Sequence, residues 1–235
     1  MPGRFILAIE TSQRQGSVAT LDEAGVVTQR ILHSRTRHDN ALMPTVDELM
    51  HALNAQPRDL KAVAISVGPG SFSGIRIGIA TAMMLCESLE IPAIAIPSAM
   101  VAAQATIGEG RNVNQAAVVL ACKGETAWMT HVFRDESSGR WTIRGNAGLM
   151  AATALAETDV ATVLADEHLP ADYRKWCTSH EVPIIPMTFD AAACATLAGF
   201  EWQDGTVIAD PAQLHPLYPR GPEAVALFEK RQQKM

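Results

Sequence analysis

The order in which hydrophobic periods follow one another over the first hundred residues is the strongest constraint on the fold. Three apolar, β-branched segments come in quick succession, and the tetrapeptide between the last two has the composition of a tight turn. Three strands joined so closely predict an antiparallel meander. The period then becomes helical, and a strand, a helix, a strand and a short helix follow. The expected strands are residues 5–9, 16–21, 26–32, 62–67 and 91–96, and the expected helices are residues 40–53, 75–89 and 98–106.

An antiparallel meander extended by parallel crossovers is the arrangement of the ribonuclease-H-like lobe of the actin and sugar-kinase class. The second half repeats this order more loosely, without a sequence repeat. Its expected strands are residues 116–121, 127–133, 141–144, 160–165 and 183–186, and its expected helices are residues 172–180 and 190–200. We therefore expect a two-lobed α/β protein with a ribonuclease-H-like lobe over residues 1–108. Residues 109–235 are expected to form a reduced, degenerate second lobe and a C-terminal tail.

The composition supports a large buried core and argues against a nucleic-acid-binding protein that acts alone. Hydrophobic residues make up 48% of the chain and charged residues 19%, which is the balance of a folded protein. The chain carries 25 acidic and 19 basic residues, for a net charge of -6. A protein that binds nucleic acid by itself normally has a basic face. Any contact with RNA is therefore expected to be indirect, shared with a partner or left to it.

The cysteines and the first apolar segment point to a cytoplasmic protein. The four cysteines are Cys86, Cys122, Cys177 and Cys194, and no two form a Cys-x-x-Cys pair. Neither a structural zinc site nor a redox motif is indicated, and we expect reduced thiols. The first apolar run, residues 5–9, is too short for a signal-peptide core and is followed by Glu10. We also expect that no segment is long enough to span a membrane.

Five short segments together resemble the TsaB family, the partner of the catalytic threonylcarbamoyltransferase TsaD. The segments are Ile6-Leu7-Ala8-Ile9-Glu10-Thr11-Ser12 with Gly16-Ser17-Val18-Ala19; Arg37-His38 with Leu42-Met43-Pro44; Gly68-Pro69-Gly70-Ser71-Phe72-Ser73-Gly74-Ile75-Arg76-Ile77-Gly78; Ile91-Pro92 with Ile96-Pro97-Ser98; and Pro216-Leu217-Tyr218-Pro219-Arg220. The first four cover the N-terminal hundred residues in order, and the third is the most specific. Residues 111–212 match the family only weakly.

The sequence departs from the family pattern at two charged positions. The family usually has Asp where this chain has Glu10, and an Asp-Ala-Arg segment where this chain has Leu120-Ala121-Cys122. Both departures remove or change groups that a nucleotide cleft would use. The resemblance therefore implies the fold more strongly than it implies nucleotide binding.

The glycine-rich loop at residues 68–74 has two readings. Its backbone N–H groups, followed by a helix N-terminus, could receive a phosphate, with Glu10 handling the metal of a nucleotide. The structural reading is a tight strand-to-helix turn capped by Ser73, beside a hydrogen-bonded strand end at Glu10, and we favour it because the loop lacks the Gly-Lys-Ser/Thr ending of a P-loop. The weak candidate cofactor-binding residues are Glu10, Gly68, Gly70, Ser71 and Gly74. We expect the isolated chain to bind no cofactor and ATP to bind only within a complex.

The segment that would hold a metal is empty of ligands. TsaD holds a metal through a His-x-x-x-His pair after the strand that corresponds to residues 91–96. Here that segment, residues 97–104, contains no His, Asp, Glu or Cys, so its side chains predict no metal site. His33 and His38 are five residues apart and are interpreted as surface or loop residues. The chain is therefore expected to be a non-catalytic subunit, with no catalytic residue of its own, and no metallopeptidase motif is present.

The helix after the glycine-rich loop is the most informative segment for function. Residues 77–86 carry no charged side chain, which is typical of a helix that is buried on all sides. Such a helix is either the central helix of one domain or a helix whose outer face packs on another chain, where methionines suit an adaptable interface. In the resembled family this helix and the preceding one bundle with the same helices of a partner, so we expect an interface. The candidate interface residues are Leu42, Val46, Met50, Ile75, Ile79, Met83 and Cys86.

The resemblance implies a supporting role in the synthesis of threonylcarbamoyladenosine in transfer RNA. The chain would dock the TsaD homologue as a scaffold or activator, a TsaE-type ATPase subunit would complete the assembly, and the chain alone would form a homodimer through the same helices. Two alternatives stay open. A nucleotide-binding ATPase or small-molecule kinase of the actin-like class is favoured by the glycine-rich loop, and a metallopeptidase is opposed by the missing ligands.

Overall fold

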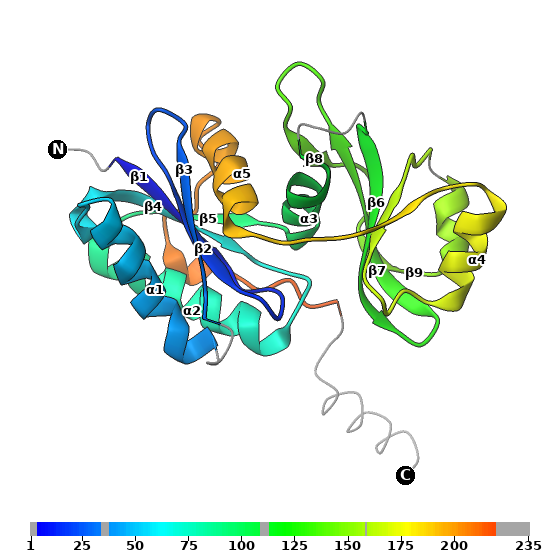
Figure 1. The fold of residues 1–235 in the computed structure, drawn as a ribbon, viewed down its shortest axis with the longest axis horizontal. Coiled ribbons are helices and arrows are strands. Elements are labelled where there is room, and N and C mark those ends of the chain that lie inside the picture. Colours follow the sequence, from blue (N-terminus) through cyan, green and yellow to red (C-terminus); the bar gives the residue numbers. More distant parts are fainter. Residues whose placement is uncertain (1–3, 34–37, 109–112, 158, 220–235) are drawn as a thin grey trace, which may run out of the picture.

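The computed structural model describes residues 4–33, 38–108, 113–157 and 159–219 (Figure 1). The N-terminal elements are β1 (Phe5–Glu10), β2 (Ser17–Leu21), β3 (Val27–Ile31), α1 (His38–Ala52), η1 (Pro57–Asp59), β4 (Leu60–Ser66), α2 (Phe72–Leu89), β5 (Ala93–Ile96) and α3 (Ser98–Ile107). The later elements are β6 (Gln115–Lys123), β7 (Thr126–Arg134), β8 (Trp141–Ile143), β9 (Gly148–Met150), η2 (Ala152–Glu157), β10 (Val163–Ala165), α4 (Ala171–Ser179), β11 (Ile184–Pro186), α5 (Ala191–Gln203) and η3 (Pro211–Gln213).

The first sheet has the strand order β3-β2-β1-β4-β5. The pairs β1–β2 and β2–β3 are antiparallel, and the pairs β1–β4 and β4–β5 are parallel. This is the meander with parallel crossovers that the hydrophobic periods predict. The two faces of the sheet differ in side-chain size because successive residues of a strand point to opposite faces. Ala8 stands between Ala19 of β2 and Ala64 of β4, so one face is small enough for a helix to approach closely.

The second sheet repeats that topology, with the order β11-β10-β6-β7-β8 and β9 added beside β7. β6, β7 and β8 form an antiparallel meander, and β10 and β11 continue it in parallel. The prediction of a two-lobed α/β protein of the actin and sugar-kinase class is confirmed. The second lobe is reduced where the first lobe has α1, because there the described residues form only β9 and the short 3₁₀ helix η2.

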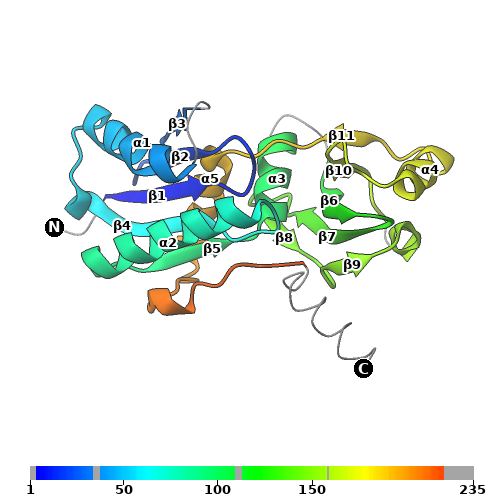
Figure 2. The same ribbon diagram turned by 90° about the horizontal axis from the view of Figure 1, so that it is seen from below.

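Helices cover both sheets on both sides, so the molecule has five layers (Figure 2). α1 and α2 cover the outer face of the first sheet, and η2 and α4 cover the outer face of the second. α3 and α5 lie between the two sheets, and one continuous hydrophobic cluster joins the inner faces of both sheets through them. Because a core side chain packs against all of its neighbours, the two lobes share one interior rather than meeting at an open hinge.

The chain returns to the first lobe after β11. α5 packs on β1 and β2, where Gly199 lies so close to Leu21 that a Cβ would come within 2.7 Å of its Cδ2. The N–H of Ala191 donates to the Ser17 hydroxyl at 2.8 Å, which fixes the start of α5 on β2. Further on, Ile208 pairs with Ala93 at the edge of β5. The expected division at residue 108 therefore separates the two sheets but not the two lobes. The second sheet and its outer helices lie within residues 113–189, whereas α5 and Ile208, later in the described chain, pack against the first sheet.

Helix α2 corrects the expectation that no segment is long enough to span a membrane. By length and composition alone its 18 residues pass that test, and 33% of them are buried inside the protein. One face of α2 packs on β4 within the hydrophobic cluster that covers the first sheet. A core helix of this length passes the same test, so the apolar character of α2 is accounted for in part by its packing on the sheet.

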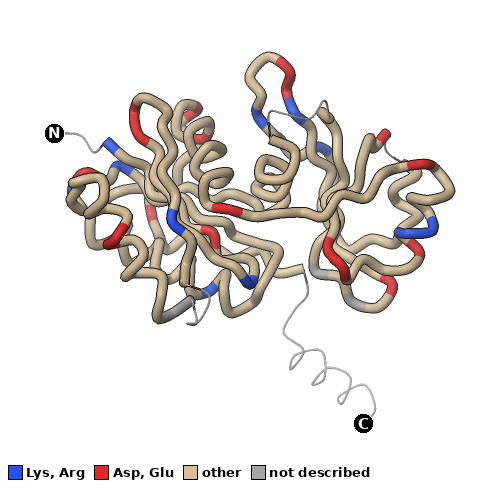
Figure 3. Tube along the Cα trace, in the orientation of Figure 1, with Lys and Arg blue, Asp and Glu red and all other residues tan. Residues whose placement is uncertain are grey.

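An arginine on the second lobe connects the two lobes. Arg140, at the start of β8, forms ion pairs with Glu201 at 2.6 Å and with Asp204, both at the end of α5. The side chain of Arg140 is 23% exposed and that of Glu201 is 14% exposed. Along the described chain, basic and acidic positions are otherwise interspersed over both lobes (Figure 3). This half-buried ion pair therefore adds a directed polar contact between the two lobes.

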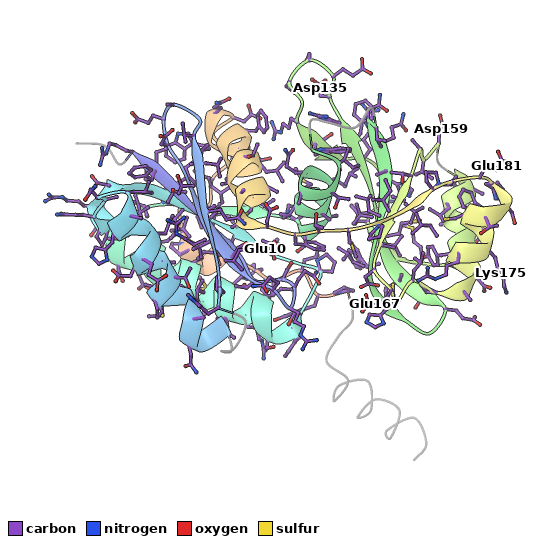
Figure 4. All side chains as sticks on the ribbon, in the orientation of Figure 1. Glu10, Asp135, Asp159, Glu167, Lys175 and Glu181 are labelled. Atoms are coloured by element: carbon purple, nitrogen blue, oxygen red, sulfur yellow. The ribbon has the colours of Figure 1, made fainter. Side chains whose placement is uncertain are left out.

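Replacing Arg140 with Gln should lower the free energy of unfolding by roughly 1–2 kcal/mol, because it removes charge-assisted hydrogen bonds and leaves Glu201 without its cation. Urea unfolding monitored by circular dichroism measures the change. Lys175→Gln is the matched control, since Lys175 pairs with Asp172 on the outer surface of α4 (Figure 4) with both side chains more than half exposed. The control should leave stability unchanged. Equal losses of unfolding free energy in both variants would show that the ion pair between the lobes stabilises the protein no more than an exposed ion pair does.

Candidate functional site

Four of the five segments that resemble TsaB meet at the carboxyl edge of the first sheet. The N–H of Ser71 donates to the carbonyl of Ser12 at 2.6 Å, which joins the glycine-rich loop to the chain after β1. The N–H of Ser98 donates to the carbonyl of Gly68 at 2.9 Å. The N–H of Leu217 donates to the carbonyl of Val67 at 2.7 Å. Segments from residues 6 to 218 are thus brought to one place by backbone hydrogen bonds.

The glycines of the loop are required by the closeness of these backbones. A Cβ added at Gly70 or at Gly74 would collide with the backbone oxygens of Ser12 and Thr11, respectively. Gly68 has φ +109°, and a Cβ there would lie 2.7 Å from the carbonyl oxygen of Leu217. Only glycine adopts this backbone without strain and leaves room for the neighbouring chain. The loop is enclosed by Thr11 and Ser12 on one side and by Leu217 on the other, which favours the structural reading of its glycines.

The cap of α2 differs from the expectation. Ser71, not Ser73, precedes the helix, and its side-chain oxygen accepts from the N–H of Gly74 at 3.3 Å. α2 therefore begins at Phe72, three residues earlier than the hydrophobic period predicted. The apolar stripe could not show this because Phe72 and Ser73 are exposed. Thr11 strengthens the same junction, since its hydroxyl donates to the carbonyl of Gly74 at 2.8 Å.

Glu10 ends β1 as a fully buried acid (Figure 4). Its Oε1 accepts from the N–H of Ser12 at 2.6 Å, while its Oε2 and the Ser12 hydroxyl have no hydrogen-bond partner among the described residues. Burial raises the pKa of the Glu10 carboxyl, and the charge of Asp190 raises it further, against the opposing effect of the Ser12 N–H and of the nearby Ser12 and Ser66 hydroxyls. A carboxyl in this setting is favoured as the neutral acid.

Polar and thiol groups surround Glu10 between the lobes. The hydroxyls of Ser66, at the end of β4, and Ser98, at the start of α3, lie 2.7 Å apart. Asp190 caps α5 by accepting from the N–H of Ala193 at 2.7 Å. Burial raises the pKa of the Cys194 thiol well above its usual value, and the charges of Glu10 and Asp190 add to this effect. Within the described ranges, His, Cys, Asp and Glu gather nowhere in groups of three or more that could hold a metal.

Replacing Glu10 with Gln should make the protein more stable than the parent at pH 8, and the difference should vanish toward acid. The folded-state pKa of Glu10 lies above its unfolded value of 4.5. The contribution of Glu10 to the free energy of unfolding is therefore fully present below pH 4.5, where the carboxyl is neutral in both states. It is lost as the pH rises toward and through the folded-state pKa, because ionisation is then easier in the unfolded chain. Urea unfolding at steps from pH 4.5 to pH 8 measures the trend.

The control for the loss of one negative charge is Glu125→Gln, at an exposed position in the turn after β6. Circular dichroism and the slope of the unfolding curve would show that each variant keeps the parental fold. A Glu10→Gln variant that becomes less stable than the parent as the pH rises would mean that the ionised carboxylate is the stabilised form.

Six of the seven candidate interface residues lie in the interior of the first lobe. Leu42, Val46, Met50, Ile75, Ile79 and Cys86 are each at most 6% exposed and pack on the outer face of the first sheet. Met83 is half-buried at the margin of the same cluster. The stripe chosen from the sequence is thus the stripe that the lobe itself covers. Sequence periodicity finds the apolar face of a helix, but it does not tell which second face of a nearly uncharged helix remains open.

The open face of α1 and α2 is formed by different residues. Phe72, Arg76, Ala80 and Met84 are four residues apart on α2, and all are exposed, with Phe72 at 50% and Met84 at 68%. Met43 of α1 is 45% exposed. Residues at this spacing share one side of a helix. This group, which we call the outer helix face, is apolar except for Arg76.

A pocket of about 430 Å³ lies at the other end of the same two helices. Its apolar lining includes Met43, Met50, Leu60 and Leu85. At its rim, the His51 ring lies 3.3 Å from the Asp47 carboxylate. The pocket extends the outer helix face toward the C-terminal ends of α1 and α2.

An aromatic contact at the start of α2 escaped the sequence analysis. The rings of Phe72 and Tyr218 lie 5.1 Å apart, and the Arg76 guanidinium lies 4.3 Å above the Phe72 ring. Tyr218 belongs to the fifth family-like segment, and its position in that segment was the only available signal. The contact places the end of the described chain beside the N-terminus of α2.

The remaining predicted positions lie away from this junction or outside the described side chains. Leu120 is buried between the sheets, Cys122 is half-buried on the opposite face of β6, and the side chain of Ala121 is not described. The segment that replaces the family's Asp-Ala-Arg therefore contributes to hydrophobic packing. His33 is exposed, and the side chain of His38 lies outside the described residues.

The family model described as "TsaD: tRNA N6-adenosine threonylcarbamoyltransferase" matches residues 25–161, more than half of the chain. A "tRNA threonylcarbamoyladenosine biosynthesis protein TsaB" of Bacillus subtilis is 38% identical over 93 residues, 40% of this chain and 41% of that protein. The protein of the same name from Escherichia coli is 32% identical over 136 residues, 58% of each chain. These matches thus span about half of the length of the curated relatives.

A solved structure called "YeaZ from Pseudomonas aeruginosa" superimposes with a TM-score of 0.76 and 22% identity, covering 92% of this chain and 99% of the other. A second Pseudomonas aeruginosa structure, described as "an uncharacterized protein with similarity to peptidase YEAZ", has a TM-score of 0.77, also with 22% identity and 92% coverage of this chain. At this identity the likeness establishes a shared fold.

Proposed function

The chain belongs to the family related to tRNA N6-adenosine threonylcarbamoyltransferases, as a member of its TsaB branch, and on this premise we propose that it is the non-catalytic subunit that docks the TsaD-type transferase. In this role it supports the synthesis of threonylcarbamoyladenosine in transfer RNA without contributing a reacting group. It contacts the RNA only indirectly, through the assembled complex in the cytoplasm.

The outer helix face is the observation that carries the proposal. Met43, Phe72 and Met84 expose large apolar side chains on two neighbouring helices that are otherwise packed on the sheet. Large apolar side chains exposed on neighbouring helices are typical of interaction sites. Ala80 in the middle is small enough for another helix to approach closely. A helical partner surface is the natural complement, because the ridges of one helix pack in the grooves of the next.

The same face accounts for the proposed assembly states. A second copy of the chain could present the same apolar stripe, so we propose that the isolated chain pairs with itself through α1 and α2. The homodimer and the complex with the transferase would then exclude one another. A TsaE-type ATPase subunit would bind the assembled pair, and any ATP needed by the complex would be held there rather than by this chain alone.

The rival function, a nucleotide-binding ATPase or kinase, is disfavoured by the enclosed loop. The N–H groups of Ser71 and Gly74 already have acceptors, and the backbone at Thr11 and Ser12 lies directly against Gly74 and Gly70. Glu10 is fully buried and favoured as the neutral acid, which is a poor state for holding Mg²⁺.

Replacing Met84 with Asp should leave the protein folded while weakening capture of the transferase subunit by at least about tenfold. A carboxylate at the centre of the contact must lose its hydration on association, and a buried unpaired charge costs several kcal/mol, where about 1.4 kcal/mol is tenfold in affinity. Surface plasmon resonance with the cognate TsaD homologue measures the affinity, and sedimentation measures self-association.

The matched control is Leu149→Asp, which places the same charge at a 44% exposed apolar residue of the second lobe. It should bind the transferase and pair with itself like the parent. Ile79→Asp is the control for a buried position. Because Ile79 is buried, this variant should lose the cooperative thermal transition. A folded Met84→Asp variant that still captures the transferase would place the docking surface elsewhere.

Calorimetric titration of the isolated chain with ATP and Mg²⁺ should give no saturable heat at millimolar nucleotide. The reason is the enclosure of the glycine-rich loop by Ser12 and Leu217. A Glu10→Ala variant titrated in parallel distinguishes the proposed non-catalytic subunit from an ATPase or kinase. Saturable binding that disappears on Glu10→Ala would support the ATPase or kinase function instead.

A further inference from the structure

The outer face of the second sheet is covered by helices over only part of its area. Ala117 of β6 and Met129 of β7 are buried beneath η2 and α4 in one hydrophobic cluster. Because alternate residues of a strand share a face, Gln115 of β6 and both His131 and Phe133 of β7 lie on the same side of the sheet. These three side chains are only half-buried. This end of the outer face therefore lacks the full cover that α1 and α2 give to the first sheet.

A pocket of about 260 Å³ lies at this open end of the sheet. Gln115, His131 and Phe133 line it, together with Arg144, which follows β8, and Val160, which precedes β10. Pockets for drug-sized ligands are typically about 300–1,000 Å³. The volume therefore suits a smaller molecule.

Arg144 is held in place at this pocket by two contacts. Its backbone N–H donates to the carbonyl of His131 at 3.0 Å, and its guanidinium carbon lies 3.6 Å from the centre of the Phe133 ring. A guanidinium stacked on an aromatic face keeps the N–H donors at its edge. Within the described chain, these N–H groups have no hydrogen-bond or ion-pair partner. A planar anion such as a carboxylate can approach this edge and accept two parallel hydrogen bonds.

The other polar groups at the pocket are neutral. Burial lowers the pKa of His131, so its imidazole is favoured without charge and offers one N–H donor. The side-chain amide of Gln115 offers two more donors. The remaining lining is largely apolar and includes Ala116, Val132 and Val160. One cation, two neutral donor groups and apolar walls match a ligand with a single negative group on an apolar body.

We propose that this pocket binds a small carboxylic acid with an apolar side chain, whose carboxylate pairs with the guanidinium edge of Arg144. The donors of His131 and Gln115 serve the remaining lone pairs of the carboxylate, and the apolar body packs against Val160. A phosphate fits less well, because its oxygens point in several directions and the apolar walls leave some of them without a hydrogen bond. The site uses no residue of the outer helix face, so it does not depend on the proposed docking function.

Titration of the full chain with sodium isovalerate tests the site, with isovaleramide as a neutral probe of the same shape. Nuclear magnetic resonance follows the ring protons of His131 and the Nε–H of Arg144. Isovalerate should shift both sets of signals saturably. Isovaleramide should bind at least about tenfold more weakly, because it lacks the negative charge and the second oxygen that the guanidinium edge pairs with.

Replacing Arg144 with Gln should weaken the binding of isovalerate by at least about tenfold, read from the His131 signals. Arg144→Lys should recover only part of the affinity, because lysine keeps the charge but not the planar fork. Arg144 is exposed, so both variants should keep the circular dichroism spectrum of the parent.

Arg76→Gln is the matched control, since the Arg76 guanidinium also lies over a phenylalanine ring, that of Phe72 at 4.3 Å, but outside this pocket. This variant should bind isovalerate like the parent. Equal weakening in Arg76→Gln and Arg144→Gln would overturn the proposal, because any stacked arginine would then attract the anion. Equal affinity for isovalerate and isovaleramide, or no saturable shift at His131 and Arg144, would overturn it as well.

Discussion

The hydrogen bond from the N–H of Ser71 to the carbonyl of Ser12 holds the glycine-rich loop, and with it the start of α2, against the chain after β1. It is possible only because Gly70 and Gly74 have no side chain, so that the backbone of the loop lies directly on the chain after β1. The same contact sets where α2 begins and which of its sides faces the sheet. The outer helix face is therefore determined by residues that are not part of it.

The order of strands and helices in both lobes could be predicted because hydrophobic period and turn composition are local properties. The extent of each lobe could not, because α5 is apolar on nearly every side and nothing in its sequence says which sheet it covers. Its position depends on the hydroxyl of Ser17 and on the close approach of Gly199 to Leu21, two contacts between residues more than 170 positions apart. The short strand β9 and the 3₁₀ helix η2 likewise have too few residues to show a period.

In the candidate site, too, the features that are local in the sequence could be predicted, and those that depend on tertiary contacts could not. The glycine-rich loop and Glu10 were found from the sequence, and their structural role follows from contacts with Thr11, Ser12 and Leu217. The helix pair was found as well, but the residues chosen on it were those that the lobe buries. A helix with no charged residue from 77 to 86 offers two apolar sides, and only the position of the sheet tells them apart. The exposed ring of Phe72 and its contact with Tyr218 depend on the return of the chain end, which no local pattern could reveal.

The return of α5 to the first sheet has a consequence for synthesis on the ribosome. The inner face of β1 and β2, with Ala8 and Ala19, stays without its covering helix until residue 203 has left the exit tunnel. A nascent chain of 108 residues therefore has all five strands of its first sheet but only one finished side, and it must wait until the second sheet and its helices have been made. Domains generally fold as units during translation, and exposed apolar surface in the interval invites aggregation. The small side chains on this face limit how much apolar surface is exposed while the sheet waits, so the alanines that let α5 approach closely also serve the unfinished protein.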